Sequence, residues 1–289
     1  MPRPIGPTIP RWQLGEQLNK LREAAGISLA TVADRLECST SKVTKIEAGL
    51  VGMVKAELEV MLTLYGADDA TRTEMLDLQK LGKQRGWWAK FGQVPNPFAT
   101  FLGLESAATT IRIFEPLMVH GLLQTEAYAR AISISVSMDE TEAAQERQVQ
   151  LRMERQQHVL AEDPPDLWVI FDESVLHRVI GSQEIMAEQL QHLAKMTRDH
   201  KILVIPFDRA GHPGSLGAFT VFEFAEDRHS PVVYVEGQAG NLYMEKAEEL
   251  TRCNLALHHM TAAALSRPES AKLIAAVARQ MAETARSRQ

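Results

Sequence analysis

The sequence has few cysteines and no long apolar run. Its two cysteines, Cys38 and Cys253, lie outside any CxxC or His-flanked pattern. This excludes a disulfide framework or a cysteine-based zinc site, and we expect two reduced, partly buried thiols. No apolar run reaches the roughly 18–20 residues that span a bilayer, and the first residues lack the apolar core of a signal peptide. We therefore expect a cytoplasmic protein with no membrane partner.

Catalytic and cofactor motifs are missing as well. None of the nine histidines shows HExxH or paired metal-ligand spacing, and GxSxG, P-loop and GxGxxG patterns do not occur. The glycine-rich run "GHPGSLGAF" lacks the Lys-Ser/Thr pair of a phosphate cradle. Asp172 and Glu173 follow a strand candidate as a carboxylate pair, but we favour a helix amino-terminal cap. We expect no enzyme, no cofactor and no metal site.

The charge is unevenly distributed along the chain. Residues 1–90 hold 13 Lys+Arg against 11 Asp+Glu, a balance of +2, whereas the whole chain carries -6, which leaves -8 for the remainder. A mildly basic segment joined to an acidic one is typical of a DNA-binding domain with an attached domain of another role. The acidity of the whole chain therefore does not exclude DNA binding.

The first third of the chain has the pattern of a small helical domain. Residues 1–10 contain four prolines and predict an extended, flexible arm. Residues 11–83 then show apolar residues at helical spacing, divided by Gly26, Gly49 and Gly66. We predict an all-α domain of five helices there, followed by a hinge over 84–100.

Residues 101–289 predict an α+β domain with a small mixed or antiparallel sheet. Strand candidates rich in β-branched and aromatic residues occur at 166–172, 201–208, 217–225 and 231–237. Helices are expected over 103–116, 125–136, 139–163, 173–180, 182–200, 241–265 and 266–287.

Residues 28–50 have helix-turn-helix spacing: two short helices are separated by a tight connection at Glu37–Cys38. Val43 and Ile46 give the second helix an apolar inner face, and its amino end offers polar side chains to base edges and phosphates. The predicted DNA-binding residues are Ser39, Thr40, Ser41, Lys42, Thr44 and Lys45. On spacing alone, a surface helix of some other helical bundle is the alternative.

These residues also predict how DNA is bound. If Lys42 reads a base, Lys42→Ala weakens operator binding by roughly 1–3 kcal/mol. Arg3 and Arg11 either add phosphate or minor-groove contacts or have no DNA role. We expect a homodimer on a double-stranded operator, with two reading helices about 34–36 Å apart.

The stretch "LREAAGISLATVADRLECSTSKVTKIEAG" resembles the Xre/Cro type of helix-turn-helix domain. The resemblance implies a structural ion pair between Arg22 and Glu47 that ties the first helix to the third. Family members usually carry Gln at the position of Leu29, where it contacts phosphate and braces the third helix. The present sequence departs from the family at that residue.

Further motifs resemble, in order, the large C-terminal domain of actinobacterial WhiJ-like regulators. They are "RGWW", "GLESAATTIRIFEPLMVHGLLQTEAYARAI", "DESVLHRVIGS", "EQLQHL", "VIPFDRAGHPGSLGAFTVFEF" and "VVYVE". Relatives usually read "PGLLQT", whereas here His120 precedes Gly121. The resemblance implies an antitoxin-like transcription regulator controlled by a small partner protein encoded nearby.

Two roles stay open for the C-terminal domain. A partner protein would dock on an apolar groove or a sheet edge, for instance near "GHPGSLGAFTVFEF". A small-molecule-responsive repressor would need a closed pocket, for which Trp168, His212, Tyr234 and Tyr243 are candidates. A third reading is an interaction protein whose DNA-binding domain is degenerate, as the missing Gln at Leu29 would suggest.

Overall fold

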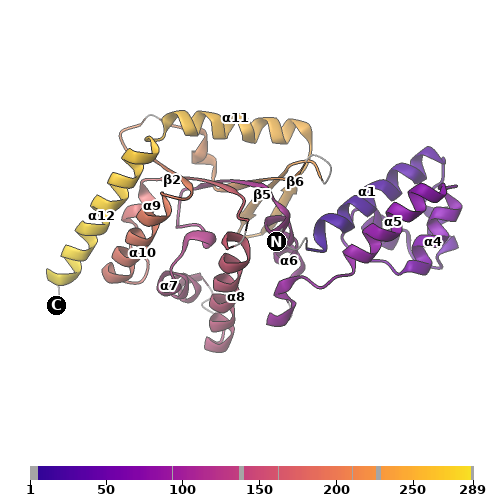
Figure 1. The fold of residues 1–289 in the computed structure, drawn as a ribbon, viewed down its shortest axis with the longest axis horizontal. Coiled ribbons are helices and arrows are strands. Elements are labelled where there is room, and N and C mark those ends of the chain that lie inside the picture. Colours follow the sequence, from indigo (N-terminus) through magenta and orange to yellow (C-terminus); the bar gives the residue numbers. More distant parts are fainter. Residues whose placement is uncertain are drawn as a thin grey trace. The chain divides into compact units, whose positions relative to one another are not determined.

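The computed structural model describes residues 6–92, 94–136, 140–161, 163–209, 211–225 and 229–287. The chain divides into two compact units, and the main division falls between Ala107 and Ala108. The N-terminal unit is helical, and the C-terminal unit combines helices with a sheet (Figure 1). The expected fold class, helical and then α+β, is confirmed.

Five helices form the body of the N-terminal unit, as predicted. They are α1 (Thr8–Ala24), α2 (Leu29–Arg35), α3 (Thr40–Glu47), α4 (Lys55–Leu64) and α5 (Asp69–Gly82). The 3-10 helix η1 (Trp87–Phe91) and α6 (Asn96–Ala107) complete the unit. Helix α1 begins at Thr8, so the last three residues of the predicted arm are helical, while residues 1–5, Arg3 included, lie outside the described residues.

Glycines and hydroxyl caps set the limits of the short helices. Gly26 follows α1 and Gly49 follows α3, both at a φ of +66°, a left-handed conformation that favours glycine. Ser28 accepts a hydrogen bond from the backbone N–H of Thr31 at 3.1 Å and thereby caps α2. The first turns of the helix-turn-helix segment are thus fixed locally.

A single apolar core holds the five helices together. Leu18, Val32, Val43, Leu58 and Met61 are all fully buried in it. They come from four different helices, α1 to α4, so each helix places one apolar face inward. The core fixes which side of α3 remains for solvent.

Gly15 allows α1 to approach the end of α3 closely. A Cβ atom at this position would lie 2.5 Å from the Glu47 carbonyl oxygen and 2.7 Å from that of Ile46, both backbone atoms. We therefore expect Gly15→Ala to destabilise the N-terminal unit by about 1–3 kcal/mol, although Ala favours a helix by about 1 kcal/mol. Thermal unfolding against Glu16→Ala, an exposed change in the same helix, checks this; a stabilised Gly15→Ala variant would contradict the close packing.

The C-terminal unit is built on a six-stranded mixed sheet, larger than the small sheet expected. The order is β3-β2-β1-β4-β5-β6. Strands β1 (Thr110–Glu115), β2 (Asp166–Asp172) and β3 (Lys201–Ile205) are parallel. Strands β4 (Phe219–Glu223), β5 (Val232–Gly237) and β6 (Gly240–Met244) continue the sheet antiparallel from β1.

Helices cover both faces of this sheet (Figure 1). Helix α11 (Ala247–Ala263) covers one face, where Leu257 and Met260 pack on Phe114, Ile170 and Val221. The crossover helices lie on the other face: α7 (Glu126–Val136), α8 (Glu142–Leu160), α9 (Ser174–His177) and α10 (Gln183–Met196), with the 3-10 turn η2 (Gly121–Leu123). Helix α12 (Arg267–Ser287) packs against α10 and β3, and the 3-10 turn η3 (Pro213–Leu216) packs against α11.

Two expected helices were partly wrong. Residues 110–115, expected within a helix over 103–116, form the central strand β1, and residues 240–244 form β6 before α11 begins at Ala247. Both are short strands next to strongly helical sequence. The prediction was wrong because the helical pattern of the neighbouring residues was continued into these strands. All four strand candidates are confirmed, as β2, β3, β4 and β5.

No helix within the described ranges is both long and apolar enough to cross a membrane. Cys38 and Cys253 are free and partly buried, as predicted.

Candidate nucleic-acid interface

Helix α3 presents one buried face and one exposed face. Val43 and Ile46 are buried, while Thr40, Ser41, Thr44 and Lys45 are exposed. At 3.6 residues per turn, these four side chains occupy an arc of about 140°. The prediction of an inward apolar face and an outward polar face is thus reproduced by the structure.

Ser39 starts α3 as a cap. Its hydroxyl accepts a hydrogen bond from the Lys42 backbone N–H at 3.2 Å. The connection before it is tight because Glu37 adopts a left-handed φ of +49°. The Thr44 hydroxyl donates to the Thr40 carbonyl oxygen at 3.1 Å, so its donor is used within the helix.

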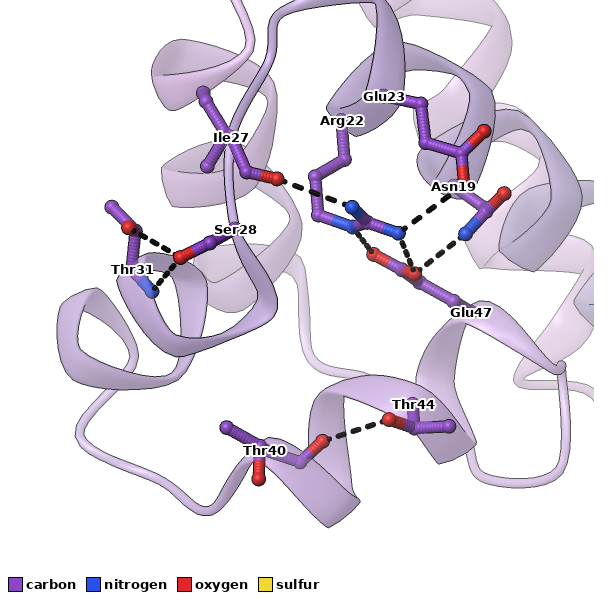
Figure 2. A network of polar contacts seen from close by, with 9 residues as sticks. All are labelled: Asn19, Arg22, Glu23, Ile27, Ser28, Thr31, Thr40, Thr44 and Glu47. Carbon is purple, nitrogen blue, oxygen red and sulfur yellow. Dashed lines mark hydrogen bonds and ion pairs between the residues drawn. The ribbon is translucent and has the colours of Figure 1, made fainter.

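The Arg22–Glu47 pair fixes the carboxyl end of α3 against α1 (Figure 2). Arg22 Nε donates to Glu47 Oε1 at 2.7 Å and Nη2 donates to Oε2 at 3.0 Å, a bidentate contact. Asn19 Nδ2 adds a bond of 2.9 Å to the same carboxylate, and Arg22 Nη1 reaches the Ile27 carbonyl oxygen. This is the ion pair that the family resemblance implied.

Both members of this pair are largely buried, with side chains 11% and 6% exposed. The hydrogen bond to Glu47 raises the pKa of Arg22 above its ordinary value. Thr40 lies at the other end of α3, away from the pair, and Thr44 lies about one turn before Glu47 (Figure 2). Glu47 therefore belongs to the scaffold of the helix, at a distance from its polar amino end.

Lys42 differs from the other predicted residues because its ammonium group has a partner. Its Nζ lies 2.5 Å from Glu57 Oε1 on α4. The hydrogen bond to Glu57 raises the pKa of Lys42. Burial acts to raise the pKa of Glu57, but the hydrogen bonds from Lys42 and from the Val54 N–H bring it below its ordinary value. Sequence reasoning did not identify Glu57.

Lys45 is the contrasting case. It is exposed and forms no ion pair with any residue in the described part of the chain. Its charge is therefore available to a phosphate.

Leu29, where the sequence departs from the family, and Arg11, whose DNA role was left open, both have structural contacts. Leu29 is partly buried and packs against the core of the N-terminal unit, so the position of the family's Gln is occupied by an apolar side chain. Arg11 lies in α1, and its Nε donates to the Gly82 carbonyl oxygen at 2.6 Å. This bond directs its guanidinium group toward the end of α5.

The four small-molecule candidates of the C-terminal unit do not form one pocket. Tyr234 and Tyr243 are neighbours on β5 and β6, with ring centroids 5.2 Å apart. Trp168 points to the opposite face of the sheet, as the strand register requires. His212 precedes η3, where its Nε2 lies 3.6 Å from Asp172 Oδ2.

A shallow hollow of about 640 Å³ lies between the sheet and the junction of α11 and α12. Trp168, Lys201, Thr261 and Arg267 contribute to its lining. Lys201 Nζ lies 3.1 Å from the centroid of the Trp168 ring, a cation–π contact. The hollow is open to solvent, unlike the enclosed pockets that bury most of a small ligand.

Asp172 and Glu173 accept hydrogen bonds from backbone N–H groups near the end of β2. Asp172 Oδ1 accepts from the Ser174 N–H at 2.9 Å, the cap-like role that we expected. Glu173 Oε2 accepts from the Phe207 N–H at 2.7 Å, and its Oε1 lies 3.2 Å from His177 Nε2. Across the described residues, no group of three or more metal-ligating side chains occurs.

His120, which departs from the family's Pro, is buried at the start of η2. Its Nδ1 accepts from the Leu122 N–H at 3.3 Å, and its Nε2 lies 3.5 Å from Arg155 Nη2. Burial, followed by the charges of Arg155 and Arg152, holds the pKa of His120 well below its ordinary value. The neutral ring therefore supplies the acceptor that organises this turn.

A second acid–base group, the half-buried Glu115 at the end of β1, lies on the same side of the sheet. Burial and the nearby Glu236 raise the pKa of Glu115 to about 8, although Arg155 acts in the opposite direction. Sequence reasoning missed this residue because Glu115 was assigned to a helix.

The geometry of α2 and α3 defines the helix-turn-helix class. In agreement, residues 13–75 match a family model described as a helix-turn-helix domain. Residues 98–276, more than half of the chain, match the model described as domain of unknown function DUF5753, and the chain belongs to this family. No curated protein and no solved structure matches the chain. The N-terminal domain supports an Xre-like regulator that binds DNA.

Proposed function

We propose that the chain is a sequence-specific transcription regulator that binds a double-stranded operator as a homodimer. The observation that carries this proposal is α3: a capped helix, fixed by Arg22 and Glu47, with its polar face in solvent. Two such helices, about 34–36 Å apart, would read the half-sites of a palindrome. We place this activity in the cytoplasm.

The contacts with DNA follow from the exposed face. Ser39, Thr40, Ser41 and Thr44 offer short polar groups to base edges and phosphates, and Lys45 offers a cation. Fluorescence anisotropy at physiological salt tests the proposal, using duplex DNA from upstream of the chain's own gene against a random duplex. Equal affinity for both would favour the alternative, an interaction protein with a degenerate DNA-binding domain.

Lys45→Ala is expected to weaken operator and random duplexes alike, because a phosphate contact carries no sequence information. The slope of log K against log salt should become shallower by about 0.9. Anisotropy titrations between 50 and 200 mM salt measure it, with Lys20→Ala, whose lysine is paired with Glu16 on α1, as the control of equal charge. A loss confined to the operator would instead make Lys45 a base reader.

For the C-terminal domain we propose an antitoxin-like role: it senses a small partner protein encoded nearby, and it is not catalytic. The four candidate side chains for a small-molecule site lie apart, with Tyr234 and Tyr243 on one face of the sheet and Trp168 on the other, which favours a protein partner over a small-molecule effector. Mass spectrometry of the natively purified protein tests this. A stoichiometric metabolite and no small protein would favour the small-molecule-responsive repressor.

A further inference from the structure

The contact between Lys42 and Glu57 joins the proposed reading helix to α4. The side chains are 42% and 21% exposed, so the acid is more enclosed than the base. The two residues are 15 positions apart, on different helices. The pair therefore exists only in the folded unit.

Glu57 is held in place independently of Lys42. Its second oxygen, Oε2, accepts from the Val54 backbone N–H at 3.0 Å and so caps the amino end of α4. The carboxylate is thus directed at Lys42 by the backbone of its own helix. An acceptor that is already oriented loses little conformational freedom when it receives the ammonium group.

Lys42 stands in the first turn of α3, the end that points toward phosphates when a helix-turn-helix domain enters the major groove. A lysine there would normally release one counterion from DNA. With a carboxylate 2.5 Å from its Nζ, Lys42 contributes no net charge to that surface.

We propose that Glu57 is a positioning residue of the DNA interface: it holds Lys42 away from the phosphates and leaves the hydroxyl side chains and Lys45 to contact DNA. This inference rests on the proposed function. It assigns Lys42 to the internal structure of the interface, in place of base reading. Because of Glu57, one fewer cation contributes to the electrostatic attraction between this surface and DNA.

Glu57→Gln tests the inference, because glutamine can still accept from the Val54 N–H but carries no charge. The released Lys42 should bind a random duplex roughly fivefold to tenfold more tightly at 0.1 M salt and make the salt slope steeper by about 0.9. The double variant Lys42→Gln/Glu57→Gln should have the wild-type salt slope. The single variant Lys42→Gln should also have the wild-type salt slope. Glu16→Gln, which frees Lys20 from a contact of the same length on α1, is the control of equal charge.

The outcomes separate the two levels of the proposal. A Glu57→Gln slope equal to that of the wild type, or equal to that of Glu16→Gln, would overturn the positioning role, as would a lack of any binding to random duplex. Wild-type affinities for operator and random duplex, measured in the same titrations, test sequence-specific binding. A steeper slope without operator preference would support Glu57 while counting against the proposed function.

Discussion

Glu47→Ala is expected to lower the free energy of unfolding of the N-terminal unit by about 3–5 kcal/mol, since it leaves a buried guanidinium group without its partner. Glu47 receives two bonds from Arg22 and one from Asn19, and its side chain is only 6% exposed. Hydrogen exchange of the α1 and α3 amides in the full chain measures the loss. The amides of the C-terminal sheet serve as an internal reference.

Removing both charges of the Arg22–Glu47 pair should lower the free energy of unfolding much less than removing one. Arg22→Met/Glu47→Leu places apolar side chains of similar volume at the same contact, which is often neutral or stabilising for buried pairs. The double variant should therefore recover most of the protection lost in Glu47→Ala. If both variants unfold alike, the packing of α1 on α3, and not the charge pair, stabilises the unit.

The same comparison bears on DNA binding. Glu47 lies at the carboxyl end of α3, and the predicted contacts lie at the amino end and along the outer face. A folded double variant should keep the operator preference. If Arg22 or Glu47 read bases directly, the double variant would lose that preference. The ion pair thus acts on DNA binding through the position of the helix.

Local signals in the sequence predicted the N-terminal unit well. Ser28 and Ser39 cap helices, and Gly26 and Gly49 end them in left-handed conformations. Each of these effects acts within a few residues, so neighbouring sequence is sufficient to detect it. The inward face of α3 followed from the same periodicity.

The missed strand β1 depends on long-range pairing. Its residues "TIRIFE" lie between β2 and β4, whose partners are 56 and 113 positions away for Thr110. A short apolar run of this kind has no decisive local period, and the helical sequence before it favoured the wrong assignment.

The Lys42–Glu57 contact was missed because it, too, depends on residues of two different helices. Val54 lacks the side-chain oxygen of a capping-box residue, so the bond from its N–H to Glu57 has no sequence signature, and the approach of Glu57 to α3 is tertiary.

Glu115 is expected to make the stability of the C-terminal unit depend strongly on pH. Its pKa of about 8 in the folded chain lies above its ordinary value of 4.5, so the folded state binds this proton more tightly than the unfolded state. The resulting stability is fully present below pH 4.5 and is lost as the pH rises through 8. Each pH unit between these limits is worth at most about 1.4 kcal/mol, so we expect the C-terminal unit to lose about 2–4 kcal/mol between pH 5 and pH 9.

Glu115→Gln isolates this term, because the amide is neutral at every pH. The variant should show a flatter dependence and should be more stable than the wild type at pH 9, as measured by urea unfolding with hydrogen exchange of β1 and β2. Glu283→Gln, an exposed change on α12, should keep the wild-type dependence. Parallel curves for wild type and Glu115→Gln would mean that the charge of Arg155 fully compensates the half-buried Glu115 carboxylate. The charges around β1 and α8 would then form a balanced network, in which the neutral His120 ring has only a structural role.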